Sequence, residues 1–279
     1  MDKVVHAVQH GDFVYVENCI ETLNVSPDAV DDESCSLLHW AAINCRYDIV
    51  KYLVQKHANV NIVGGVNAEI PIQWAVRHPR GLKLVSYLID CGSNLHHQSV
   101  YGCDALFIAI QEGKVNIAFL LLHKGANPNT VDSNGDTPLL WLVRNENAIE
   151  RRKLIRLLIS FHATVGAVNQ RDGNNGLHLL VLKEHGFFDI MLAEDLYKAA
   201  KDTLMSVKNK DGLDPLQLAY KTKNSLALSF FKDAWMNATL PSYTTIVTSA
   251  VAVSLVFVII HFCGLLWGSG LMVPLYFAW

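Results

Sequence analysis

The sequence predicts an all-α protein in which a solenoid of stacked helix pairs is followed by one or more transmembrane helices. The first observation behind this prediction is an internal repeat of about 34 residues, a period typical of solenoids built from helix pairs. The second is the distribution of charge, because only 18% of the 279 residues are charged and none of the Lys, Arg, Asp or Glu residues follows Asp233. We therefore expect a repeat domain over residues 1–235 and a membrane-embedded part after it.

The composition excludes several classes of protein. The 23 Lys and Arg residues are balanced by 26 Asp and Glu residues, which leaves no basic excess for binding nucleic acid. The six cysteines lie far apart without a CxxC pair, so we predict free thiols rather than a disulfide framework or a zinc ribbon. The N-terminus lacks the apolar core of a signal peptide, which places the first part of the chain in the cytosol.

The repeat is clearest in four successive segments, which cover 36–61, 70–96, 104–129 and 137–165. Each segment has a short apolar helix, a second apolar helix and then a turn. One position in the first helix marks the register and recurs in steps of 34, 34, 33, 38 and 39 residues: His39, Gln73, Phe107, Leu140, His178 and Gln217. The pattern resembles the ankyrin repeat, whose signature is TPLHxAA followed by LLxxGAxxN. With a degenerate first repeat and two weak final ones, the resemblance predicts six to seven repeats over 1–235.

Each unit is predicted to form two antiparallel helices and a projecting turn. In the segment 104–129, Leu106, Phe107 and Ile110 line the first helix, while Ile117 and Leu121 share one face of the second. One unit cannot bury both apolar faces, so neighbouring units stack. The insertion NENAIERRK in the fourth segment predicts a longer loop or helix there.

The repeat region contains no sequence typical of catalysis. It has no glycine-rich phosphate loop, no GxSxG elbow and no HExxH. We predict no catalytic residue, no cofactor-binding residue and no metal ligand in this chain. His39 and His178 occupy the histidine position of the repeat, where we expect a hydrogen bond to nearby backbone rather than acid–base chemistry.

The apolar end of the chain predicts the membrane segments. Residues 243–267 are expected to form a transmembrane helix, because the 22 residues Ile246–Trp267 reach about 33 Å as a helix. Lysines before this span favour a cytosolic position for the repeats. After a short turn, residues 271–279 resume the apolar pattern but are too few to cross a bilayer. We expect them to be the start of a truncated second transmembrane helix, and the chain to be a fragment or a truncated form of a longer protein.

Four motifs carry a more specific resemblance: LLHWAAIN (37–44), the following R-x-D-I-V-K-Y (46–52), NIVGGV (61–66) and PIQWA (71–75). Together they are similar to the ankyrin-containing DHHC palmitoyltransferases. The resemblance implies a full-length protein-cysteine S-palmitoyltransferase of endomembranes, with the Golgi as the expected location, that uses zinc and acyl-CoA. No DHHC string occurs in these 279 residues. The chain itself is therefore expected to bind client proteins and membrane lipid without transferring an acyl group.

The resemblance also implies a docking site for short extended segments of client proteins. The asparagine of the AAIN motif and the tryptophan of the next repeat match Asn44 and Trp74, and His78 occupies the position of Asn44 one repeat later. An asparagine can bond a peptide backbone in both senses, and a tryptophan supplies apolar area. We expect the equivalent Trp40 and Trp141 to be core residues instead.

Two other functions stay open from the sequence. The chain could be a membrane-tethered ankyrin adaptor that binds clients without acylating them. It could also be the cytosolic arm of an ankyrin-bearing cation channel, although such channels place a long linker before the first span. Here only about 20 residues separate the last repeat from Pro241. This spacing favours the palmitoyltransferase module and the adaptor over the channel.

Overall fold

A computed structural model describes residues 1–183 and 188–239. These residues divide into two compact units, Met1–Ala227 and a unit that begins at Leu228. In chain order the helices are α1 (Asp2–His10), α2 (Phe13–Glu21), α3 (Leu37–Ile43), α4 (Tyr47–Gln55), α5 (Pro71–Arg77), α6 (Leu82–Asp90), α7 (Ala105–Gln111), α8 (Val115–His123), α9 (Pro138–Arg144), α10 (Arg151–Ser160), α11 (Gly176–Val181), α12 (Ile190–Ser206), α13 (Pro215–Thr222) and α14 (Ser225–Thr239).

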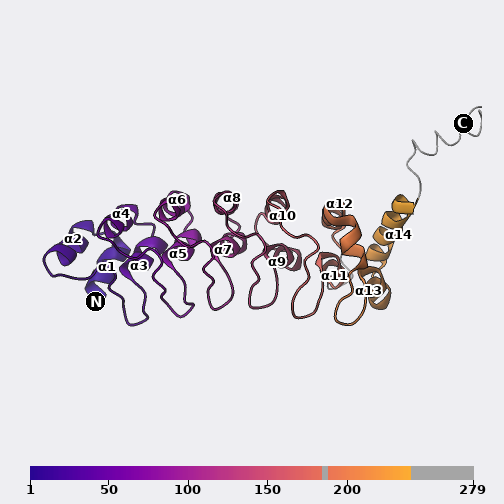
Figure 1. Ribbon diagram of the computed structural model, residues 1–279, viewed down its shortest axis with the longest axis horizontal. Helices are drawn as coiled ribbons and strands as arrows, with labels where there is room; N and C mark the ends of the chain where they lie inside the picture. The colour runs from indigo at the N-terminus through magenta and orange to yellow at the C-terminus, as the bar shows by residue number, and fades with distance from the viewer. Residues whose placement is uncertain (184–187, 240–279) are drawn as a thin grey trace, which may run out of the picture. The chain divides into compact units, whose positions relative to one another are not determined.

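The helices of the first unit form antiparallel pairs that stack on one another, as the repeat predicts. Within each pair, an odd-numbered inner helix contacts the outer helix that follows it, from α1 and α2 to α11 and α12. Each inner helix also contacts the inner helices before and after it, through to α13. Long loops, which we call fingers, project from one side and join each outer helix to the next inner helix (Figure 1). The expectation of an all-α ankyrin-repeat domain is confirmed.

The inner helices begin where the sequence supplies a capping side chain. In five of them a side-chain oxygen accepts the backbone N–H three residues later, and the capping residues are Ser36, Asp104, Thr137, Asn175 and Asp214. A proline follows directly at the first helical position of α9 and α13, where its missing N–H costs no hydrogen bond. The caps fix the start of each inner helix, and thereby the register in which the repeats stack.

The marker position of the repeat ties each unit to the next finger. Three residues there donate a side-chain N–H to a backbone carbonyl at 2.9–3.0 Å: His39 to Glu69, Gln73 to Cys103, and His178 to Leu213. All three side chains are fully buried. The predicted role of the histidines, a hydrogen bond to backbone, is confirmed. In the two repeats between, Phe107 and Leu140 fill the same position with apolar core.

The structure tests two further predictions, one about tryptophans and one about cysteines. Trp40 and Trp141 were expected in the core, and this is wrong, because both indoles are half-exposed. The five described cysteines are free thiols, as predicted, while the sixth, Cys263, lies outside the described residues.

The predicted membrane segments, 243–267 and 271–279, also lie outside the described residues. Across 1–183 and 188–239, no helix combines the length and the apolar character that crossing a membrane requires.

Candidate functional site

The predicted docking residues lie along the inner helices α3 and α5, which pack side by side. The indole of Trp74 meets the indole of Trp40 edge to face, with ring centroids 5.5 Å apart and an interplanar angle of 89°. Its other contact is the buried imidazole of His39, at 5.1 Å. Both indoles are half-exposed, so the two repeats present a continuous aromatic surface.

The two indole N–H groups differ in what they bind. Trp40 Nε1 donates to Asp31 Oδ2 at 2.7 Å and is thereby held against its own finger. Trp74 Nε1 makes no hydrogen bond to any residue that the structure describes. Trp74 therefore offers an incoming peptide both an aromatic face and a free donor, whereas the donor of Trp40 is already used.

A Gly-Gly turn makes the space that Trp74 occupies. A Cβ on Gly64 would lie only 2.3 Å from the carbonyl oxygen of Ser34, so the second finger can approach the first only with glycine there. Gly65 has φ +70°, and a Cβ on it would lie 3.3 Å from Trp74 Cζ2. The GG of the NIVGGV motif thus brings the finger close to both its neighbour and the tryptophan.

Asn44 ends α3 and turns its amide toward the same surface. Its Nδ2 donates to the carbonyl oxygen of Trp40 at 2.9 Å, which fixes the orientation of the side chain. Within the described residues its Oδ1 accepts no hydrogen bond. Asn44 can therefore accept an N–H from a peptide backbone without giving up its own contact.

His78 ends α5 in an extended conformation, one repeat beyond Asn44. Its Nδ1 accepts the backbone N–H of Arg80 at 3.1 Å, so the proton of the neutral ring is on Nε2. Burial lowers the pKa of His78, and the positive charges of Arg80, Lys114 and Arg46 lower it further. A neutral His78 is a hydrogen-bond donor through Nε2 at neutral pH.

One buried ion pair lies beside this surface, at the edge of α5. Glu69, only 4% exposed, forms a bidentate pair with Arg77 through bonds of 2.7 and 3.0 Å. Arg77 also donates to the carbonyl oxygen of Gln73, within α5. This pair adds no net charge to the edge of α5 that carries Trp74.

The thiols nearest the aromatic surface are poor nucleophiles. Burial raises the pKa of Cys35 to about 11, and the neighbouring carboxylates Asp31 and Glu33 raise it as well. Burial similarly raises the pKa of Cys103 to about 12. Both are protonated at neutral pH, whereas nucleophilic cysteines need a lowered pKa. Among the described residues, no group of three or more His, Cys, Asp or Glu side chains could hold a metal ion.

Trp141 and Asn145 hold the same two positions of the repeat as Trp40 and Asn44, three repeats later, and Trp141 was expected in the core. In the structure Asn145 Nδ2 donates to the carbonyl oxygen of Trp141 at 2.8 Å, which matches the bond between Asn44 and Trp40. Hollows open on both sides of this pair. The spacing of four residues between Trp141 and Asn145 is the same as that between Trp40 and Asn44, and it could have indicated this pair. The position of Trp141 usually has a packing role in the repeat, and this pointed to the core instead.

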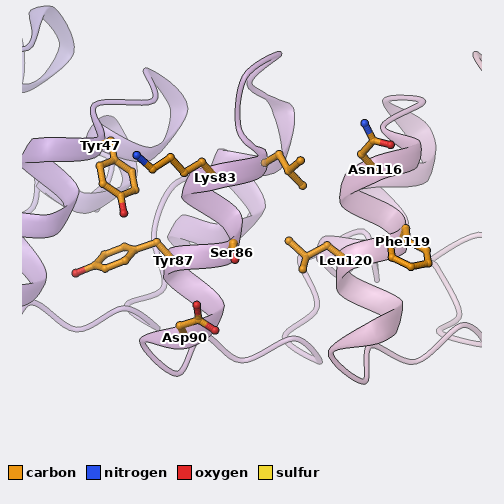
Figure 2. A pocket seen from close by; sticks show the side chains of 9 residues that line it. Tyr47, Lys83, Ser86, Tyr87, Asp90, Asn116, Phe119 and Leu120 are labelled. Atoms are coloured by element: carbon orange, nitrogen blue, oxygen red, sulfur yellow. The ribbon is translucent and has the colours of Figure 1, made fainter.

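A further hollow lies on the opposite side of the stack, between the outer helices α4, α6 and α8 (Figure 2). Lys83 Nζ stands 4.3 Å from the centre of the Tyr47 ring, and Tyr47 packs edge to face on Tyr87 at 5.5 Å. Asp90 at its rim pairs with Lys124 at 3.1 Å. These contacts join neighbouring repeats to one another, a structural role for this surface.

Comparison with known families and proteins agrees with this fold. Residues 72–160 match the family model "Ankyrin repeats (3 copies)", and residues 33–62 match the model "Ankyrin repeat". The chain is 32% identical to palmitoyltransferase ZDHHC17 of Danio rerio over 83% of its length, and 29% identical to palmitoyltransferase ZDHHC13 of Homo sapiens over 82%. Palmitoyltransferase Hip14 of Drosophila melanogaster is 29% identical over 84% of the chain.

The ankyrin-repeat region is homologous to the ankyrin part of the ZDHHC13 and ZDHHC17 palmitoyltransferases. The chain spans about a third of these relatives, with 36% of ZDHHC17 and 35% of ZDHHC13 covered. Among solved structures, the ankyrin-repeat domain of Bcl-3 aligns with a TM-score of 0.68 and 23% identity, covering 81% of this chain and 97% of that one. At this identity the likeness to Bcl-3 concerns the fold. The ankyrin repeats make protein partners the expected ligands of this region.

Proposed function

We propose that this chain is the cytosolic substrate-recruiting module of a protein S-palmitoyltransferase and binds short extended segments of client proteins. The site would be the N-terminal groove, which we define by Asn44, Trp74 and His78. The observation that carries the proposal is Trp74, whose partly exposed indole packs on Trp40 and keeps an N–H without a partner among the described residues. Homology to the ankyrin part of palmitoyltransferases supplies the class of client: a protein presented for acylation.

Each residue of the N-terminal groove would contribute one contact. Trp74 would cover an apolar side chain, such as a proline, of an extended client segment. Asn44 Oδ1 would accept a backbone N–H, and the Nε2–H of His78 would donate to a backbone carbonyl. Because extended segments expose unpaired backbone groups in just this way, the groove would bind short motifs rather than folded surfaces.

The proposal includes a membrane location. The predicted span at 243–267 and lysines that precede it would hold the repeats on the cytosolic side of an endomembrane, with the Golgi as the expected organelle. The chemistry of acyl transfer would require a DHHC segment, with its zinc and acyl-CoA, which these 279 residues do not contain. A membrane-tethered adaptor without activity would use the same groove, and sequencing the transcript past the codon for Trp279 separates the two.

The test of the groove is the affinity of peptides selected on the full chain from a phage-displayed library of random dodecamers. Truncating a central aromatic anchor typically costs ~2 kcal/mol, near thirtyfold in affinity. We expect that loss from Trp74→Ala and a smaller one from Asn44→Ala. Tyr220→Ala, which removes an exposed aromatic from α13, is the control and should leave affinity unchanged. Equal affinity for the Trp74→Ala chain and the control would reject the N-terminal groove as the docking site.

A further inference from the structure

A second groove crosses the inner helix α9, two repeats beyond α5, which carries Trp74. One hollow lies toward the fingers and reaches Asn169 and Asp172, and another lies toward the opposite end of α9 and reaches Leu182. The two hollows share three lining residues: Trp141, Arg144 and Asn145. The two hollows therefore adjoin at Trp141, and the one that reaches Leu182 lies beside both Trp141 and Asn145.

The inserted loop between α9 and α10 walls one end of this second groove. Residues 145–149 of the loop line the hollow. Ile149 packs directly on Gly113, where an added Cβ would lie 2.6 Å from Ile149 Cβ. The loop is thereby pressed onto the end of α7. The neighbouring repeats lack this insertion, so the wall is specific to the repeat formed by α9 and α10.

The second groove offers the same chemical groups as the N-terminal one. Trp141 is half-exposed, packs edge to face on Phe107 at 6.4 Å, and keeps its Nε1–H without a partner among the described residues. Asn145 binds the carbonyl oxygen of Trp141 through Nδ2, which leaves its Oδ1 free as an acceptor within that same part of the chain. Leu182, 46% exposed, adds apolar area on the far side.

The charged groups that line the second groove neutralise one another. Arg144 forms a bidentate pair with the buried Asp136, with bonds of 2.8 and 3.1 Å, and hydrogen bonding to Asp136 raises the pKa of Arg144. Lys183 pairs with Glu146 at 3.1 Å. Arg171, which lines only the hollow toward the fingers, donates to the carbonyl oxygen of Ser133. In the hollow that reaches Leu182 every charged lining residue is paired, so a charged side chain placed over Trp141 would lose water there without gaining a free partner, which is costly. The occupant that complements this lining carries no charge at its anchor.

We propose that the hollow lined by Trp141, Asn145 and Leu182 is a second docking groove, which takes an uncharged, extended segment of a protein partner with an apolar side chain laid over Trp141. The segment gives a backbone N–H to Asn145 Oδ1 and accepts the indole N–H of Trp141. The site is separate from the N-terminal groove, because Ile108 holds the same position in the repeat between them and is only 2% exposed. The chain therefore engages two segments at once.

The test uses the full 279-residue chain carrying Trp74→Ala, which removes the N-terminal groove from the selection. Dodecamers are selected on this chain from a random phage-displayed library, and their affinities are measured by fluorescence anisotropy. We expect enriched uncharged sequences whose affinity falls about tenfold or more when Trp141→Ala is added. Because Trp141→Ala can loosen the stack, Leu182→Ser is measured in parallel, and circular dichroism reports the fold of both.

The outcomes separate this groove from the function proposed above. Loss of affinity in the folded Leu182→Ser chain supports the second groove, whatever the behaviour of the N-terminal one. If no peptide is enriched on the Trp74→Ala chain, or if the enriched peptides bind equally well after Leu182→Ser, the second groove is refuted. The N-terminal groove is judged in the same way with peptides selected on the Leu182→Ser chain, from which Trp74→Ala should remove the affinity, so its failure is recorded independently.

Discussion

At the scale of single residues, a histidine and a glutamine make the same pair of hydrogen bonds at the marker position of the repeat. His39 accepts the backbone N–H of Ser36 on Nδ1 at 3.1 Å and donates from Nε2 to Glu69. Gln73 accepts the N–H of Ile70 on Oε1 at 2.8 Å and donates from Nε2 to the next finger. A protonated imidazole cannot accept the Ser36 N–H, whereas the amide of glutamine carries no titratable proton.

This difference predicts a pH dependence of stability. Burial lowers the pKa of His39 in the folded state, so the unfolded chain, with a pKa near ~6.5, binds more protons in acid. The stabilisation by neutral His39 is therefore complete above that value and is lost as the pH falls below it. We expect His39→Gln to flatten the dependence of the unfolding free energy on pH between about 7 and 5. His123→Gln, at an exposed position on α8, is the control, and equal acid sensitivity of wild type and His39→Gln would contradict the account.

The two tryptophans of the N-terminal groove should differ in stability. Trp40→Ala removes both the ring contact with Trp74 and the hydrogen bond to Asp31, a charged acceptor whose bonds contribute ~1.5–3 kcal/mol. Trp74→Ala removes the ring contact without breaking a hydrogen bond among the described residues. We expect Trp40→Ala to lower the melting temperature clearly more than Trp74→Ala. An equal fall in both would make Trp74 a packing residue and remove it from the groove.

Ser93 carries the one buried side-chain oxygen that lacks a hydrogen-bond partner in the described residues. The equivalent position in three other repeats is alanine: Ala58, Ala126 and Ala163. Because an unpaired buried hydroxyl costs ~1 kcal/mol or more, Ser93→Ala should raise the stability measured by urea denaturation. Ser99→Ala is the matched control, since the equally buried Ser99 hydroxyl accepts the N–H of Tyr101, and it should destabilise the chain. A destabilised Ser93→Ala chain would show that the hydroxyl has a partner after all.

At the residue scale, the sequence predicted the hydrogen bonds of the histidines better than the solvent exposure of the tryptophans. The recurrence of His39 and His178 at one position of the repeat was enough to predict their backbone bonds. The exposure of Trp40 and Trp141 was not predictable in the same way. It depends on which neighbouring side chains flank the concave face, and the usual packing role of that position pointed to the core.

At the scale of elements, an arginine closes the C-terminal end of α9. Arg151, from the start of α10, donates from Nε to the carbonyl oxygen of Leu142 at 2.7 Å and from Nη2 to that of Val143 at 3.0 Å. A third bond, from Nη1 to Asp189, ties it to the beginning of α12. These carbonyls belong to the last turn of a helix, whose oxygens have no partner within the helix itself.

Removing this arginine should loosen the fifth and sixth helix pairs together. Arg151 is only 11% exposed, and its hydrogen bonds are charge-assisted, each contributing ~1.5–3 kcal/mol. We expect Arg151→Ala to lower the melting temperature and to speed hydrogen exchange in α9. Arg152→Ala, at a side chain 49% exposed, should change neither. Unaltered exchange in α9 of the Arg151→Ala chain would mean that water satisfies these carbonyls as well.

The helix pairs up to residue 165 follow from the repeat, because capping residues and apolar spacing recur there at nearly fixed intervals. The later elements were less predictable. α12 runs for 17 residues with a break in helical geometry at Ala200, where the signature of the repeat fades in the sequence. A lengthened outer helix keeps the apolar periodicity but shifts its register, and spacing alone does not place such a break.

At the scale of the whole molecule, stability in a stack of this kind is a sum over repeats and the interfaces between neighbours. The two grooves lie on inner helices separated by a fully packed repeat, so a partner with two segments could bind both. Binding of linked segments then gains from effective concentration rather than from new contacts. A tandem peptide that joins one ligand of each groove with a flexible linker should bind more tightly than either alone, and the gain should vanish in the Leu182→Ser chain.

The most direct test of the central claim, that clients dock on the inner helices, is to map where a bound peptide lies. A selected peptide carrying a photo-crosslinking side chain at its apolar anchor is irradiated with the full chain, and the crosslinked residues are identified by mass spectrometry. The account predicts crosslinks on α3 and α5, between Trp40 and His78. Crosslinks confined to the hollow between the outer helices, around Tyr87 and Phe119, would contradict it.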